Sequence, residues 1–143
     1  MPEMLEQTKI GASKEKVWEI LTNFATYKNW SKVITAVNFK NGLAVGNEGT
    51  YTCKVWHHND SYRESPVTIT KFESGNTLGW GVQKGCFIDS TWMFTVSDDG
   101  SGGCIFQHEM KVYGCFSPMV PTTKWFKYSR PFGLELKARA ERA

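Results

Sequence analysis

The C-terminal stretch, residues 118–143, limits what this chain can fold into more than any other part of the sequence. After Pro121 it carries the longest helical pattern in the chain, with apolar side chains that recur at intervals of three and four residues. This apolar stripe consists of Trp125, Tyr128, Phe132, Leu136 and Ala140. Such a helix is stable when its stripe lies on another apolar surface. Pro131 stands in the middle of the stretch, where it lacks an N–H group, and it predicts a kink.

The middle of the chain predicts a sheet that supplies this surface. From Val33 onward, apolar and polar residues alternate, and turn signals rich in glycine and asparagine separate the alternating runs. Together with an earlier run near the N-terminus, the predicted strands are 3–10, 33–39, 49–57, 63–72, 77–82, 87–96 and 104–113. The run 98–103 contains aspartate, serine and glycine alone, and it predicts the loop of a hairpin.

Two short helical segments are predicted between the first strand and the second. Ser13 is placed as the N-cap of a helix that ends near Asn23, and aromatic residues spaced three apart predict further helical turns over 24–30. We interpret those aromatic residues as core. The chain contains no internal repeat and no linker long enough to divide it, so residues 1–143 are predicted to form one domain.

Composition and charge argue against several classes of function. The net charge is only +3 and no run of Lys or Arg exceeds two residues, so no nucleic-acid partner is predicted. No apolar run approaches the ~20 residues that span a bilayer, and the start lacks the pattern of a secretory signal. We therefore expect a cytoplasmic protein that does not insert into a membrane. The four cysteines show no C-x-x-C spacing, so no metal site is predicted.

A set of positions along the whole chain matches a known pattern. These positions are 12–18, Leu21, Phe24, Tyr27, Trp30, Ser31, 49–50, 78–80, 106–109, Gly114 and 136–141. With the order of the predicted elements, they resemble the START/Bet v 1-like (SRPBCC) superfamily, in its polyketide cyclase/dehydrase-like branch. The resemblance implies an α+β helix-grip fold, in which a curved, seven-stranded antiparallel sheet wraps around a long C-terminal helix. Two short helices follow the first strand in this fold, and an apolar cavity lies between sheet and helix.

Strand alternation predicts which side chains face that cavity. Aromatic and apolar side chains of the inner face and the helical stripe are predicted to bind the ligand. They are Val55, Trp80, Trp92, Phe94, Phe106, Met110, Trp125, Tyr128 and Phe132. Three further inner-face residues, His57, His108 and Tyr51, are predicted to act in acid–base chemistry or to polarise a carbonyl oxygen. For each histidine, a structural or solvent-facing role is the alternative.

Three functions remain open at this point. The first is an enzyme, without cofactor or metal, that promotes the cyclisation, dehydration or isomerisation of a hydrophobic small molecule, as in natural-product biosynthesis. The second is a non-catalytic carrier or sensor of a lipid-like or hormone-like ligand. The third is a partner-binding module whose aromatic residues are only core. The enzyme is favoured because two titratable groups in an apolar pocket are unusual for a pure carrier. Both a monomer and a homodimer are compatible with the sequence.

Overall fold

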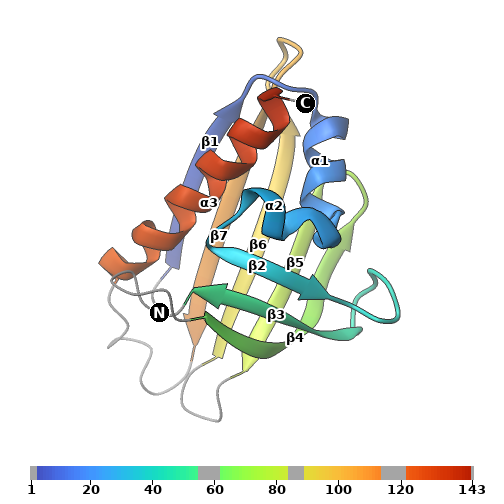
Figure 1. The fold of residues 1–143 in the computed structure, drawn as a ribbon, viewed down its shortest axis with the longest axis vertical. Helices are drawn as coiled ribbons and strands as arrows, with labels where there is room; N and C mark the ends of the chain where they lie inside the picture. Colours follow the sequence, from blue (N-terminus) through green and yellow to red (C-terminus); the bar gives the residue numbers. More distant parts are fainter. Residues whose placement is uncertain (1–2, 55–61, 84–88, 114–121, 143) are drawn as a thin grey trace.

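The elements follow one another in the predicted order (Figure 1). The structure, a computed structural model, describes residues 3–54, 62–83, 89–113 and 122–142. Its helices are α1 (Lys14–Thr22), the 3-10 turn η1 (Phe24–Thr26), α2 (Tyr27–Trp30) and α3 (Thr122–Arg142). Its strands are β1 (Glu3–Ile10), β2 (Ile34–Asn38), β3 (Glu48–Lys54), β4 (Tyr62–Glu73), β5 (Thr77–Gln83), β6 (Asp89–Asp98) and β7 (Cys104–Tyr113).

Seven strands form one antiparallel sheet in the order β1-β7-β6-β5-β4-β3-β2. β1 and β2 are therefore the two edge strands. The sheet curls into a half-barrel, in which β2, β3 and β4 cross the direction of β1 and β7, and α3 lies along β1 (Figure 1). This confirms the predicted α+β helix-grip architecture.

Local contacts explain the helical segments after β1. The Ser13 hydroxyl accepts a hydrogen bond from the Lys16 N–H at 3.2 Å, which caps α1 as predicted. The backbone N–H of Asn23 donates to the carbonyls of the preceding turn and ends α1. Next, the Tyr27 hydroxyl donates to the Leu21 carbonyl, and this hydrogen bond ties the start of α2 to the end of α1.

Strand alternation holds for most of the sheet and is interrupted by bulges. In β2 the pairing with β3 shifts between Ile34 and Ala36, and Ile34 is buried together with Val37 although their spacing is odd. A second register shift lies between Ile69 and Lys71 in β4. Each bulge bends its strand, and the bends accompany the curl of the sheet.

The predicted apolar stripe of α3 is confirmed over its second half. Phe132, Leu136 and Ala140 are completely buried, whereas Leu134 on the opposite side is 52% exposed. The helix continues through Pro131 to Arg142, so the proline does not end it. A kink at this position stays a prediction.

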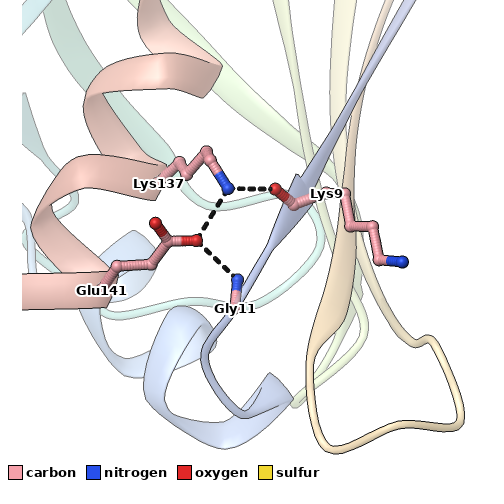
Figure 2. Close-up of polar contacts among 4 residues, drawn as sticks. All are labelled: Lys9, Gly11, Lys137 and Glu141. Carbon is pink, nitrogen blue, oxygen red and sulfur yellow. Dashed lines mark hydrogen bonds and ion pairs between the residues drawn. The ribbon is translucent and has the colours of Figure 1, made fainter.

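A polar clasp of four residues ties the last turns of α3 to the end of β1 (Figure 2). The Lys137 ammonium group donates to the Lys9 carbonyl at 2.9 Å and to the Glu141 carboxylate at 2.7 Å. The same carboxylate accepts the backbone N–H of Gly11 at 2.7 Å. These two donors, Lys137 first and Gly11 second, lower the pKa of Glu141. The carboxylate therefore stays charged and satisfies a backbone donor just beyond β1.

A second contact ties α3 to the connection between α2 and β2. The Glu135 carboxylate accepts the backbone N–H of Lys32 at 2.8 Å and the Ser31 hydroxyl at 3.3 Å. Ser31 itself is buried, and its oxygen accepts the N–H groups of Val33 and Ile34. Burial raises the pKa of Glu135, against the opposing effect of these hydrogen bonds. The helix is thus attached next to both edge strands, after β1 and before β2.

α3 and β1 approach each other closely at Gly133. A Cβ atom at this position would stand 2.5 Å from the Thr8 hydroxyl oxygen, which is closer than such atoms approach in proteins. One turn earlier, the Arg130 guanidinium pairs with the Glu6 carboxylate at 3.2 Å. A side chain at 133 would therefore have to displace Thr8 if helix and strand kept this distance.

We expect Gly133→Ala to destabilise the protein. Alanine in a helix interior ordinarily gains about 1 kcal/mol over glycine, but the clash with Thr8 should reverse the sign and cost about 1–3 kcal/mol. Urea denaturation followed by circular dichroism measures the difference. The matched control is Thr8→Ala combined with Gly133→Ala, which removes the clashing hydroxyl and should recover most of the loss. A single variant as stable as the wild type would contradict this account of the contact.

Candidate functional site

Aromatic side chains from β5, β6 and β7 meet Phe132 of α3 on the concave face of the sheet. The ring centroids of Trp80 and Phe94 lie 4.9 Å apart, and those of Phe94 and Phe132 lie 5.7 Å apart. Phe106 stacks on Phe94 at 5.9 Å and contacts Phe132 at 6.1 Å. These four predicted ligand-binding residues therefore form one continuous aromatic cluster between sheet and helix.

His108 lies inside this cluster, as its strand position predicted. Its ring centroid is 4.4 Å from that of Phe94, 5.5 Å from Trp92 and 5.8 Å from Phe132. Burial lowers the pKa of His108 to about 3. The imidazole is therefore neutral at pH 7. Its conjugate acid is so strong that His108 is a poor general base in this packing.

Tyr51 approaches the same cluster from β3. Its ring centroid lies 6.0 Å from that of Trp80 and 5.8 Å from that of Trp92. The side chain is almost completely buried, which agrees with the inner face predicted for it. Tyr51 is thus an acid–base candidate whose ring the structure places beside those of Trp80 and Trp92.

The other predicted site residues cannot be placed in the same way. Val55 and His57 lie outside the described residues. The backbones of Trp125 and Tyr128 belong to α3, but their side chains lie outside the described part of the structure. Their predicted roles stay predictions, and the contribution of His57 in particular is untested.

Three residues between β1 and β3 complete the cluster and were not predicted as site residues. Tyr27 and Trp30 of α2 contact Phe132 with ring centroids at 6.0 Å and 5.4 Å. Phe39, just after β2, contacts Trp80 at 6.2 Å. The interpretation of Tyr27 and Trp30 as core is confirmed by their burial. Their spacing of three residues predicted a helical turn, but it did not predict that they contact Phe132 of α3.

Packing within the concave face is graded along β6 and β7. Phe94 and His108 form one cross-strand pair and are 0% and 1% exposed. The next inward-facing pair, Trp92 and Met110, is 9% and 8% exposed. This pair lies nearer to the start of β6 and the end of β7. The accessible surface of the inward-facing side chains therefore increases in that direction.

Charged groups are absent from the described interior. The buried polar side chains of the described residues are Ser31, Ser65, Thr77 and His108. Within the same residues, no three His, Cys, Asp or Glu side chains come close enough to hold a metal ion. The described interior is thus suited to binding uncharged groups.

No helix of the described segments has the length and apolar character needed to cross a bilayer.

We expect the burial of His108 to make stability depend on pH. In the unfolded chain the imidazole takes up a proton near pH 6.5, whereas in the folded protein it stays neutral down to about pH 3. Between these values the unfolded state binds more protons, so acidification lowers the free energy of unfolding, by at most about 1.4 kcal/mol per pH unit. Denaturation at several pH values between 7.5 and 5 should show a steeper fall for the wild type than for His108→Leu. Equal slopes would show that His108 is protonated in the folded state.

Known proteins share the fold and the sequence pattern of this chain. Residues 1–141 match the model of a family described as "Polyketide cyclase / dehydrase and lipid transport". No curated protein matches the chain. Solved structures show the same fold. Ginseng major latex-like protein 151 from Panax ginseng is 13% identical, with 97% of each chain covered and a TM-score of 0.75.

Two further solved structures illustrate the range of proteins with this fold. A START superfamily protein from Mycobacterium smegmatis is 15% identical, over 98% of this chain and 97% of that chain, with a TM-score of 0.70. Norcoclaurine synthase from Thalictrum flavum is 9% identical, over 99% of this chain and 87% of that chain, with a TM-score of 0.68. At these identities the likeness shows the fold alone. The match of the family model over nearly the whole sequence shows more: the chain belongs to the polyketide cyclase/dehydrase and lipid transport family, as its resemblance to the START/Bet v 1-like superfamily predicted.

Proposed function

We propose that the protein binds a hydrophobic small molecule between the concave face of the sheet and α3. The observation that carries this proposal is the aromatic cluster, in which rings of β5, β6 and β7 pack together and those of β6 and β7 contact Phe132 of the helix. Flat, apolar surfaces of this kind bind small molecules through burial of apolar area and ring stacking. Membership of a family described by polyketide cyclisation and lipid transport supports the same class of ligand.

The graded packing suggests where the ligand lies. Phe94, Phe106 and His108 are in contact with one another and are at most 1% exposed, so this end of the interior is filled by the protein itself. Trp92 and Met110 retain some accessible surface on the same face. We place the ligand against this pair, with the ring of Tyr51 on one side of Trp92.

The interior also favours a neutral ligand. Transfer of an isolated charge from water into an apolar interior is very costly unless an opposite charge receives it. The described interior offers polar but uncharged groups, since His108 is neutral at pH 7. A carboxylate or ammonium group of a ligand would therefore have to remain at the open end.

We expect Trp92→Leu to weaken the binding of a neutral hydrophobic probe, Nile red, by roughly tenfold, because leucine keeps the apolar character but removes the flat stacking surface. Fluorescence titration measures the dissociation constant. Trp18→Leu is the matched control, because Trp18 on α1 packs against Phe72 rather than against the cluster. Equal weakening by both substitutions, or no binding of Nile red to the wild type, would contradict the proposal.

Catalysis of a cyclisation, dehydration or isomerisation is a second candidate function. One observation favours it: Tyr51 holds a phenol beside the ring of Trp92, where it could polarise a carbonyl oxygen of the ligand. The low pKa of His108 removes the other described acid–base candidate at neutral pH. The alternative is a carrier that releases its ligand unchanged.

Comparison of co-purified compounds separates the enzyme from the carrier. Wild type, Tyr51→Phe and His57→Gln would be expressed in the same cells, and the small molecule that leaves each protein would be identified by native mass spectrometry. An enzyme is expected to carry a product in the wild type and an unconverted compound, for a dehydration heavier by one water, in the variant that lacks its catalytic group. Identical compounds in all three proteins would identify a carrier.

A further inference from the structure

Two tryptophan side chains in the interior carry hydrogen-bond donors for which the described residues supply no acceptor. The indole N–H groups of Trp30 and Trp80 are buried, and within the described part of the chain no acceptor lies within hydrogen-bonding distance. By contrast, the buried hydroxyls of Tyr27 and Ser31 both make hydrogen bonds. A buried donor without an acceptor is costly, and native proteins leave few of them. Each such group therefore points to an acceptor supplied from elsewhere.

Trp80 is the donor that lies on the ligand side. It stands on β5 in the middle of the concave face, directly opposite Trp92 in the ladder with β6. Its ring contacts Tyr51 at 6.0 Å, and both neighbours keep a small accessible surface. Trp30 instead lies on α2 against Tyr27. Trp80 is therefore adjacent to Tyr51 and Trp92, the two rings beside which we place the ligand.

We infer that the indole N–H of Trp80 is a specificity-determining donor, which binds an oxygen acceptor on a neutral, flat ligand. This inference rests on the proposed binding function and makes it more specific. A carbonyl or ether oxygen in the ring system satisfies the donor, whereas a hydrocarbon of the same shape leaves it unsatisfied. The selection arises because the site already contains an unmet donor, so a ligand without an acceptor leaves that cost in place.

The test uses two probes that differ at one position. Fluorenone and fluorene share a flat tricyclic skeleton, and the carbonyl group of the first replaces a methylene group of the second. Both would be titrated against the wild-type protein in competition with Nile red. We expect fluorenone to bind roughly tenfold more tightly than fluorene, which is the effect of one satisfied buried donor. Equal affinities for the two probes would overturn the inference while leaving the proposed function intact. Failure of both to bind would contradict the proposed function, and the inference with it.

Substitution of the donor provides the matched comparison. Trp80→Phe keeps an aromatic ring but removes the N–H, so the preference for fluorenone should disappear while fluorene still binds. Trp18→Phe makes the same chemical change outside the cluster and should retain the tenfold preference. Because the ratio of two affinities is compared, a general weakening of binding by either substitution does not affect the result. A preference that survives Trp80→Phe would overturn the assignment.

A measurement on the wild-type protein makes the test independent of how well the variant folds. The indole N–H proton of Trp80 can be followed by nitrogen-15 NMR. Its resonance should move downfield when fluorenone is added, because the proton enters a hydrogen bond, and it should not do so with fluorene. The same response to both probes would contradict the inference.

Discussion

α3 is attached next to both edge strands of a single curled sheet. The rest of the structure depends on this constraint. A sheet with an apolar concave face and two free edges exposes that face to water unless another element covers it. The stripe of α3 covers it, and the clasp around Glu141 and the contacts of Glu135 hold the helix in place. One contact lies beyond β1 and the other before β2. The polar groups therefore set the position of the helix, while the buried rings beneath it supply most of the stabilisation.

The same arrangement gives the interior its chemical character. Rings from sheet and helix surround His108 so closely that protonation would place an ion among hydrocarbon, and this is why its pKa is lowered. An acid–base role for His108 would require that the surrounding rings move apart and let water or a polar group reach the imidazole. The candidate site is thereby displaced along the strands, toward Trp92 and Met110. In the proposed site, shape and ring stacking would dominate recognition, and the Trp80 indole N–H would distinguish between ligands of similar shape.

Much of this fold could be predicted from the sequence, because hydrophobic periodicity reports directly on buried faces. The stripe of α3, the cap at Ser13 and the inward positions of Phe94 and His108 are examples. The bulge after Ile34 could not be predicted, since it arises from the pairing of β2 with β3 and leaves no mark in composition. The alternation of residues along a strand also tells which face a side chain lies on, but not how far it is from its neighbours. It identified His108 as inward-facing, whereas the close contact with aromatic rings that makes the imidazole a weak base is seen only in the structure.

The contact between Gly133 and Thr8 has a consequence for how the interior can change its volume. Gly133 lies against the Thr8 side chain, so a slide of α3 along β1 would bring a larger residue against Thr8. If the protein binds ligands of different bulk, we therefore expect the side chains around Trp92 and Met110 to adjust, while α3 keeps its position along β1.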